Sequence, residues 1–262
     1  MPPALLGAVQ YALAPGGKRL RPMLVLLSAE AVGGVRDDAM DAAAAIELVH
    51  NFSLVHDDLP AMDDDSMRRG RPTLHVQSGE AMAILAGDMM LSLAFEVLNR
   101  NVDPERASRL TRELAQATGC MIGGQVLDTV GSEWTDSAAA LEAIHRRKTG
   151  ALIRACCRMG GICGSADDRQ FEALTQYGES IGLMFQIVDD LLDVTRSSEE
   201  IGKTAGKDVE AGKLTYPGLY GIAASRQAVE SLRESAERAA GSLGGAARPL
   251  TELADRLATR TR

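Results

Sequence analysis

Aromatic residues, cysteine pairs and long apolar runs are all scarce in this sequence, and each scarcity excludes a class of protein. Only 3% of the 262 residues are aromatic, and alanine, leucine, methionine and glutamate are common, which favours helices over sheets. None of the four cysteines forms a CxxC pair, so a zinc site or a thioredoxin-like site is not expected. The longest apolar run, residues 81–95, is interrupted by Asp88 and falls short of the roughly 18 uninterrupted residues that a membrane span needs.

An excess of positive charge and a secretory leader are also lacking. The net charge of −8 argues against nucleic acids or anionic membranes as the main partner, because both attract basic proteins. A signal peptide begins with a basic stretch before its apolar residues, and residues 1–17 lack such a stretch. Cys120, Cys156, Cys157 and Cys163 lie in apolar segments and are interpreted as buried, reduced thiols. We therefore expect a cytoplasmic protein.

Apolar residues at spacings of three and four run through most of the chain, and this periodicity predicts α-helices. No segment shows the alternation of a half-buried strand, and no GxGxxG motif is found. Loops are expected at the glycine- and proline-rich residues 15–17, 60–72, 131–136, 160–168 and 197–212. Long helices are predicted over residues 20–32, 42–59, 80–98, 106–130, 138–159 and 171–194, with two or three shorter ones between residues 214 and 257. The chain, residues 1–262, is thus expected to form one all-α domain of roughly ten helices.

Two aspartate clusters each follow an apolar helix, and they are the first features that point to chemistry. In the first cluster, Asp57 and Asp58 are separated from Asp63 by Pro60, which prevents a straight continuation of the helix. On a straight helix Asp57 and Asp63 would not share a face. A local turn or bulge would bring Asp63 back beside Asp57.

The second cluster comprises Asp189, Asp190 and Asp193. Asp189 and Asp193 are four residues apart and therefore lie on one face of a helix. Close like charges repel one another, and a hard divalent cation such as Mg²⁺ relieves the repulsion by taking oxygen ligands. A single Asp-Asp pair is most often a solvated helix end, but two clusters can face each other across a bundle cavity. The sequence therefore favours a carboxylate metal site.

Three basic segments with glycines accompany the aspartates. Arginine binds phosphate oxygens in pairs, lysine supplies a point charge, and small residues let the backbone approach an anion. The segments are residues 16–22 (GGKRLRP), 67–73 (MRRGRPT) and 202–213 (GKTAGKDVEAGK). Each alone is typical of a solvated loop, but together with the aspartates they indicate two bound diphosphates, one of them held through Mg²⁺.

These motifs, in this order, resemble those of the bacterial short-chain trans-prenyl diphosphate synthases of the farnesyl diphosphate synthase type, in the polyprenyl synthetase family. Residues 57–63 (DDLPAMD) are similar to the longer form of the family's first aspartate-rich motif, and residues 189–193 (DDLLD) to the second. The resemblance runs from Gly16 to about Leu257. It implies an isoprenoid-synthase-type helical bundle around a central cavity, a homodimer, and up to three Mg²⁺ ions.

The reaction that the resemblance implies is a Mg²⁺-dependent head-to-tail condensation. Isopentenyl diphosphate joins an allylic diphosphate, dimethylallyl or geranyl, through an allylic carbocation to give farnesyl diphosphate. By the same resemblance, the ions are held by Asp57, Asp58, Asp63, Asp189, Asp190 and Asp193. The allylic diphosphate is bound by Arg68 and Lys213 beside the catalytic residues Lys148, Thr149, Gln186 and Lys203, and isopentenyl diphosphate is bound by Lys18, Arg21, His50 and Arg69. Gln125 and Asp128 match a segment that lines the cavity.

Phe52 and Ser53 are the predicted determinants of product length. Phe52 lies five residues before Asp57, about 7.5 Å away along a helix at ~1.5 Å per residue. In the resembled family a bulky aromatic residue here, followed by a small one, accompanies short products, which predicts farnesyl diphosphate. An ordinary core aromatic is the alternative interpretation of Phe52.

Other functions remain as alternatives. A geranylgeranyl or geranyl diphosphate synthase would share the fold and the motifs, and Phe52 argues against the longer product. A class I terpene cyclase would carry a different second metal motif, and a non-catalytic subunit of a prenyl synthase would lack aspartates or lysines that are present here. The segment before Gly16 is short, so the family's first helix is expected to be missing or shortened. Ser66 and Arg71 also differ from the family's commonest residues, in a loop where little effect is expected.

Overall fold

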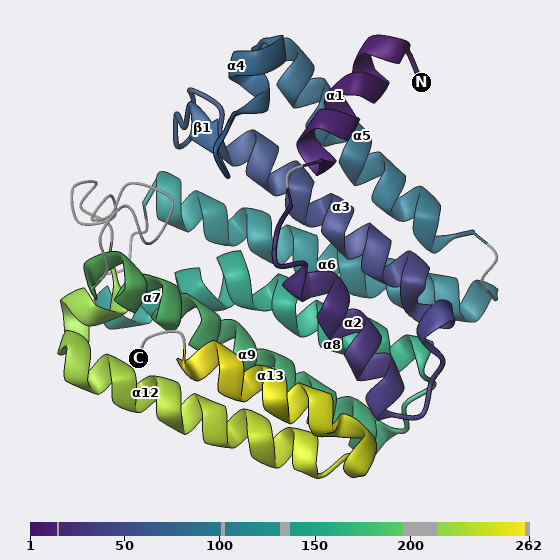
Figure 1. Ribbon diagram of the computed structural model, residues 1–262, viewed down its shortest axis with the longest axis vertical. Coiled ribbons are helices and arrows are strands. Elements are labelled where there is room, and N and C mark those ends of the chain that lie inside the picture. Colours follow the sequence, from purple (N-terminus) through teal and green to yellow (C-terminus); the bar gives the residue numbers. More distant parts are fainter. Residues whose placement is uncertain (15, 101–102, 132–136, 196–213, 260–262) are drawn as a thin grey trace.

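The computed structural model describes residues 1–14, 16–100, 103–131, 137–195 and 214–259, and these residues are mainly helical (Figure 1). The α-helices are α1 (Pro3–Leu13), α2 (Leu20–Ala31), α3 (Met40–Asp57), α4 (Leu74–Ser78), α5 (Glu80–Leu98), α6 (Pro104–Thr129), α7 (Ser137–Ile144), α8 (Ala151–Cys163), α9 (Asp168–Thr195), α12 (Tyr216–Gly241) and α13 (Arg248–Ala258). Two 3-10 turns, η1 (Arg36–Ala39) and η3 (Gly245–Ala247), and one π-helix, η2 (His145–Gly150), complete the helical elements of the described residues. Strands β1 (Met67–Arg68) and β2 (Arg71–Pro72) form a hairpin. The all-α prediction is confirmed.

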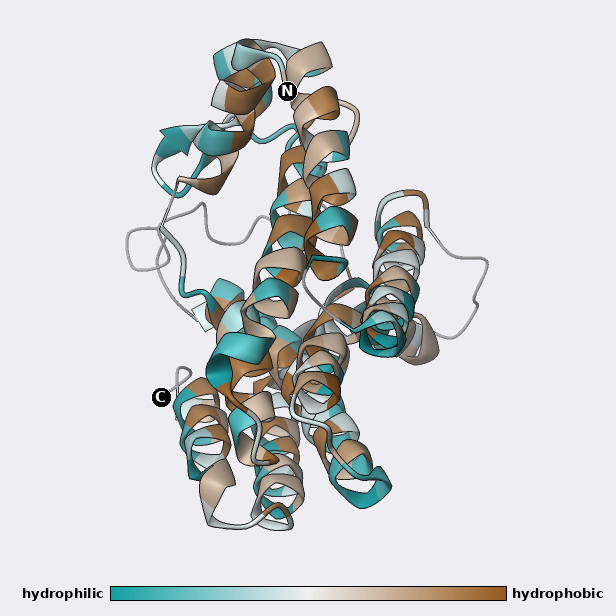
Figure 2. Cartoon of the chain, turned by 90° about the vertical axis from the view of Figure 1, so that its right-hand side faces the viewer, coloured by the Kyte–Doolittle hydropathy of each residue, from teal (hydrophilic) through white to brown (hydrophobic). Residues whose placement is uncertain are grey.

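Helix α8 lies at the centre of the bundle. It is buried along almost its whole length and packs against α2, α6 and α9. Helix α3 packs along α5, while α12 and α13 pack on α9 (Figure 1). Figure 2 shows apolar residues where the helices face one another and polar residues on the β1–β2 hairpin. The core therefore runs through the two helices, α3 and α9, that carry the aspartate clusters.

The close approach of α2 to α8 depends on a glycine. A Cβ atom at Gly160 would lie 2.3 Å from the carbonyl oxygen of Val25, so a larger residue would push the two helices apart. Arg21 lies one turn before Val25 on α2. The tight helix contact therefore holds Arg21 in the buried space beside Cys156 of α8.

The predicted helix over residues 138–159 is divided, because the π-helix η2 separates α7 from α8. The backbone of η2 fits tightly between two glycines. A Cβ atom at Gly124 of α6 would lie 2.3 Å from the nitrogen of Lys148, and one at Gly182 of α9 would lie 2.8 Å from the Cα of Gly150. A π-turn adds one residue to a helical turn and often marks a functional site, but it leaves the apolar spacing on either side unchanged.

Three further expectations are corrected. Residues 60–72, expected to be a loop, contain the β1–β2 hairpin. The region after residue 214 holds one long helix, α12, which bends at the non-helical Gly221, besides the shorter η3 and α13. Cys120 is exposed on α6, whereas the other three cysteines are buried as expected.

Helix α5 (Glu80–Leu98) is, within the described part of the chain, the one helix long and apolar enough to cross a membrane by length and composition. It extends the apolar run of residues 81–95, which alone was too short for a span. Core helices of soluble proteins pass the same test. Since α5 packs along α3 and also contacts α1, α4 and α6, we assign it to the bundle.

Candidate active site

The first aspartate cluster folds back on itself at the end of α3. The N–H of Asp63 donates to the carbonyl oxygen of Asp57 at 2.9 Å, so the chain turns around Pro60 as the sequence predicts. Burial raises the pKa of Asp57 to about 6. The positive charge of Lys148 opposes this rise, and the negative charge of Asp63 adds to it. A further cation beside Asp57 would therefore be favoured, because it would stabilise the charged form of this carboxyl group.

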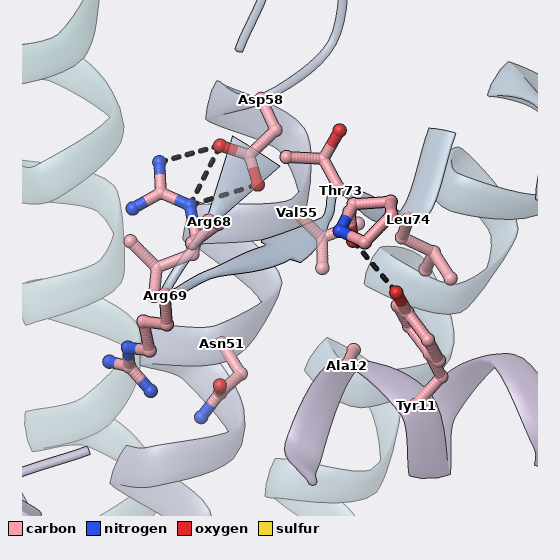
Figure 3. A pocket seen from close by; sticks show the side chains of 11 residues that line it. Tyr11, Ala12, Asn51, Val55, Asp58, Arg68, Arg69, Thr73 and Leu74 are labelled. Atoms are coloured by element: carbon pink, nitrogen blue, oxygen red, sulfur yellow. Dashed lines mark hydrogen bonds and ion pairs between the residues drawn. The ribbon is translucent and has the colours of Figure 1, made fainter. Parts of the chain in front are cut away.

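Asp58 is engaged by Arg68 of β1 (Figure 3). Arg68 donates from Nε to both carboxylate oxygens, at 2.7 and 2.9 Å, and from Nη2 to Oδ1 at 2.5 Å. The side chain of Asp58 is only 4% exposed, and its burial raises its pKa while Arg68 opposes the rise. A carboxylate this deeply buried needs such a partner to remain charged. In this structure Asp58 therefore positions Arg68, the arginine that the resemblance places on the allylic diphosphate.

Asp190 has several hydrogen-bond donors around it in the second cluster. It accepts from Gln186 Nε2 at 2.9 Å and from the backbone N–H of Tyr216 at 2.9 Å. The Nε2 atom of His145 lies 3.4 Å from the Oδ2 atom of Asp190. On the next turn of α9, the buried Oδ2 of Asp193 has no hydrogen-bond partner among the described residues. Asp190 thus connects α9 to η2 and α12, and Asp193 keeps a buried oxygen whose hydrogen-bonding capacity is unused within the described residues.

The π-helix η2 presents Lys148 and Thr149 between α6 and α9. Lys148 forms an ion pair with Asp128 of α6, with 2.5 Å between Nζ and Oδ2. The hydroxyl of Thr149 donates to Gln186 Oε1 at 2.9 Å. These side chains line one pocket of about 440 Å³, counted with its opening to solvent, together with His145, Asp190 and Thr215. The structure therefore brings together the Lys-Thr pair, Gln186 and Asp128, which lie far apart in the sequence.

Cations from other elements lie within electrostatic reach of each aspartate cluster. Lys148 is close enough to Asp57 to lower its pKa, although it comes from the other side of the bundle. Arg21 of α2 is likewise within electrostatic reach of Asp189 of α9. A cation from another element thus lies near each cluster, Lys148 near that of α3 and Arg21 near that of α9.

Arg21 and His50 form the half-buried part of the predicted isopentenyl diphosphate site. The Nη1 atom of Arg21 lies 3.3 Å from Nε2 of His50, and Arg21 Nε has no hydrogen-bond partner among the described residues. Burial lowers the pKa of His50 well below its ordinary value of 6.5, and the positive charge of Arg21 lowers it further. His50 is therefore neutral near pH 7, and Arg21 carries the charge.

The remaining predicted residues lie nearer the surface or outside the described residues. Lys18 is exposed and Arg69 forms the tip of the β1–β2 hairpin. Gln125 is half-buried on α6, and its Nε2 has no hydrogen-bond partner among the residues described. Lys203 and Lys213 lie outside the described residues.

Sequence reasoning missed three residues that shape this region: Tyr11, His145 and Tyr216. His145 stands three residues before Lys148, and its burial lowers its pKa to about 4, so it is neutral at pH 7. Its position in the segment before the Lys-Thr pair is the one signal that could have drawn attention to it. The contacts of Tyr11 and Tyr216 join segments that are far apart in the sequence, so no local spacing predicts them.

The carboxylates fit an open metal site rather than a preformed cage. Within the described ranges, no group of three or more His, Cys, Asp or Glu side chains is placed to hold a metal ion. Mg²⁺ commonly takes one or two carboxylates and completes its shell with phosphate oxygens and water. The raised pKa of Asp57 and the unpartnered oxygen of Asp193 are the features that such an ion would satisfy.

The bundle, the paired aspartates and the surrounding cations define a prenyltransferase, an enzyme that joins isoprenoid diphosphates. The chain belongs to the polyprenyl synthetase family, whose profile matches residues 2–246. Both the family and the type of enzyme predicted from the sequence are confirmed.

Relatives of this chain carry the names of two different products. It is 49% identical to geranylgeranyl pyrophosphate synthase 11 of Arabidopsis thaliana chloroplasts, over 97% of this chain and 74% of that protein. It is 48% identical to the farnesyl diphosphate synthase of Haemophilus influenzae, over 88% of this chain and 81% of that protein. The family is thereby shown, but the choice between a farnesyl and a geranylgeranyl product is left open.

Solved structures agree with this assignment. A geranylgeranyl pyrophosphate synthase crystal structure superposes with a TM-score of 0.92 at 30% identity, covering 100% of this chain and 93% of that one. A geranyltransferase from Legionella pneumophila superposes with a TM-score of 0.87 at 35% identity, covering 99% of this chain and 88% of that one. The isoprenoid-synthase fold expected from the sequence is therefore confirmed.

Proposed function

We propose that this protein condenses isopentenyl diphosphate with dimethylallyl or geranyl diphosphate to form farnesyl diphosphate. The observation that carries the proposal is the position of Lys148, which is paired with Asp128 and lies within electrostatic reach of Asp57. Lys148 shares its pocket with Thr149 and Gln186. A cation beside Asp57 of α3, in a pocket that Asp190 of α9 also lines, is placed to bind a metal-bound diphosphate.

We propose that Mg²⁺ is held by Asp57 and Asp63 on one side and by Asp189 and Asp193 on the other. The resemblance also includes Asp58 and Asp190 among the ligands. In this structure Asp58 accepts from Arg68, and Asp190 accepts from Gln186 and Tyr216. When bound, Mg²⁺ neutralises the negative charge that develops on the leaving diphosphate. The protein would contribute carboxylates from both clusters, and diphosphate oxygens and water would supply the remaining ligands.

The chemistry proper needs charge stabilisation and no protein nucleophile. As the allylic C–O bond breaks, Arg68 and Lys148 stabilise the charge on the departing diphosphate. Lys148 pairs with Asp128 in this structure, so diphosphate binding competes for the same ammonium group. The double bond of isopentenyl diphosphate attacks the allylic carbocation, and the released diphosphate takes the proton that is then lost.

Thr149 and Gln186 stabilise the carbocation with their oxygen atoms. Gln186 donates its NH₂ group to Asp190, which turns its carbonyl oxygen toward Thr149. The orientation of the amide is therefore fixed by a hydrogen bond at each end. Buried apolar residues of α9 on both sides of Gln186, such as Met184 and Ile187, exclude water that would quench the cation.

The second substrate is bound by the basic groups of α2, α3 and the hairpin. Arg21 lies deep beside the neutral His50, with Arg69 and Lys18 closer to solvent. Arginine forms paired hydrogen bonds with phosphate oxygens, and the unpartnered Nε of Arg21 fits this role. We propose that these four residues hold the diphosphate of isopentenyl diphosphate.

The farnesyl product is proposed on the position of Phe52. Its side chain is 7% exposed, and its ring meets the ring of His56 edge-on with 5.1 Å between centroids. The Nε2 atom of His56 lies 3.1 Å from the carbonyl oxygen of Ile84 on α5, so Phe52 sits where α3 meets α5. Geranylgeranyl diphosphate is the second candidate, favoured by the names of relatives such as the Arabidopsis thaliana synthase.

Incubation of the purified protein with isopentenyl and dimethylallyl diphosphates and Mg²⁺ tests this function. Chromatography of the dephosphorylated products should show farnesol as the main alcohol, and removal of Mg²⁺ by a chelator should stop its formation. A main product of geranylgeraniol would replace the farnesyl assignment with the second candidate. No product from a folded sample would contradict an autonomous synthase and favour a non-catalytic subunit.

We propose a homodimer from the exposed apolar side chains of α5 and α6. Ile84 and Leu85 of α5 and Ile122 and Val126 of α6 are between 43% and 55% exposed. Exposed apolar groups of this kind mark association surfaces. Light scattering should give about twice the chain mass of 27.8 kDa, and a monomer at micromolar concentration would contradict the proposal.

A cytoplasmic location is proposed on charge and cysteine content alone.

A further inference from the structure

The N-terminal helix α1 contacts the β1–β2 hairpin through Tyr11 (Figure 3). Tyr11, near the end of α1, donates its hydroxyl proton to the carbonyl oxygen of Pro72 at 2.8 Å. The guanidinium of Arg71 lies over the ring of Tyr11, 4.3 Å from its centroid. Such cation–π contacts are favourable, and more so where solvent is excluded. The Tyr11 side chain therefore contacts both residues of strand β2, Arg71 and Pro72.

Strand β2 in turn fixes the tip of the hairpin. Arg68 pairs with Arg71, and Met67 pairs with Pro72, in antiparallel register. The tip consists of Arg69 and Gly70, with φ values of 51° and 74°. Both residues occupy the left-handed region that two-residue hairpin turns require, and this region is unfavourable for a residue such as Arg69. Arg69 keeps this conformation because the strands on either side are held.

The tip of the hairpin also meets the loop after α1. A Cβ atom at Gly17 would lie 2.7 Å from Nη1 of Arg69, so the guanidinium rests directly against the backbone of this glycine. Gly17 precedes Lys18, another residue of the proposed isopentenyl diphosphate site. The N-terminal segment therefore contacts the hairpin twice, through Tyr11 on β2 and through Gly17 on Arg69.

The two neighbouring arginines depend on this clamp to different degrees. Arg68 is anchored by three hydrogen bonds to the buried carboxylate of Asp58, which belongs to the end of α3. Arg69 lies beyond this anchor, at the tip that Tyr11 steadies through β2. Loss of the Tyr11 contact should therefore displace Arg69 much more than Arg68.

We propose that Tyr11 is a positioning residue for the diphosphate bound by Arg69: it clamps β2 and so fixes Arg69 at the hairpin tip against Gly17. The inference rests on the proposed function, in which this diphosphate is isopentenyl diphosphate. Helix α1 is then part of substrate recognition. Arg71, for which its loop position predicts little effect, is part of the same clamp.

The variant Tyr11→Phe tests the proposal, because it removes the hydroxyl and keeps the ring under Arg71. The KM for isopentenyl diphosphate should rise about three- to tenfold, the effect of one ordinary hydrogen bond, while kcat and the allylic KM stay within about twofold. Calorimetric titration with isopentenyl diphosphate alone should show the same loss of affinity. Arg71→Gln should shift the same KM in the same direction.

Tyr177→Phe is the matched control, since the hydroxyl of Tyr177 also donates to a backbone carbonyl, that of Leu250, at 2.8 Å. It should lower thermal stability and leave both KM values unchanged. An active wild type with unchanged substrate affinity in Tyr11→Phe would overturn the clamp, and so would equal rises in both KM values. No condensation by the wild type would instead remove the proposed function, and the titration would still decide whether Tyr11 affects diphosphate binding.

Discussion

Asp57→Asn is expected to lower the condensation rate by about 10²–10³-fold, the cost of losing a group that stabilises charge in the transition state. Asparagine keeps the shape of the side chain but removes the charge that the proposal assigns to Mg²⁺ binding. The concentration of Mg²⁺ needed for half-maximal rate should rise in parallel. Steady-state kinetics over a Mg²⁺ series measures both effects.

The same substitution should make the protein without ligands more stable. Burial raises the pKa of Asp57 from 3.8 to about 6, so the charged carboxylate opposes folding above pH 6. Asparagine removes that cost, and we expect a gain of about 1–2 kcal/mol at pH 8, after allowance for solvent screening at a half-buried site. Well below pH 3.8 the carboxyl is protonated in both states, and the gain should disappear. Urea unfolding at the two pH values measures it.

Asp64→Asn supplies the control for Asp57→Asn. Asp64 lies on the same turn, is exposed, and has a φ of 49°, a conformation that asparagine adopts readily. It should change neither the rate nor the Mg²⁺ requirement. Full activity in Asp57→Asn would remove Asp57 from the proposed metal site, and a loss of stability at pH 8 would contradict the electrostatic cost assigned to it.

Helix periodicity and the aspartate motifs are local in sequence, and for this reason they were predictable. Pro60 predicts that α3 ends and turns, and the hydrogen bond from Asp63 to Asp57 is the result. The pairing of Asp58 with Arg68 was not predictable in the same way, since it depends on how the hairpin folds back over α3. The resemblance assigns Asp58 to the metal, but the structure shows its oxygens bound by a guanidinium.

Contacts between distant segments account for most of what the sequence does not disclose. Tyr11 and Pro72 are 61 residues apart, and Tyr11 belongs to no motif. The π-turn of η2 brings Thr149 against Gln186, 37 residues away, but its extra residue does not disturb the apolar spacing of α7 or α8. Packing of one helix against another determines these contacts, and no window along the chain contains both partners.

Phe52→Ala is expected to change the main product from farnesyl diphosphate to geranylgeranyl diphosphate or longer chains. Ser53 lies one helical turn before Asp57 on the same face of α3, and it is small. Phe52 is the adjacent bulky residue, and its removal opens space between α3 and α5. A chain that stops at this ring for steric reasons should then add further isoprene units. Chromatography of the dephosphorylated products measures the chain lengths.

Stability must be followed in the same experiment, because Phe52 is nearly buried and its removal leaves a cavity worth about 3 kcal/mol. Phe52→Leu removes less side-chain volume. It should give a mixture of products and a smaller loss of stability than Phe52→Ala. Phe171→Ala truncates another aromatic, on α9, whose ring lies under Arg158 of α8, and it should destabilise the protein without changing product length. Farnesyl diphosphate as the unchanged product of a folded Phe52→Ala would reduce Phe52 to a core aromatic. The limit on chain length would then lie elsewhere in the cavity.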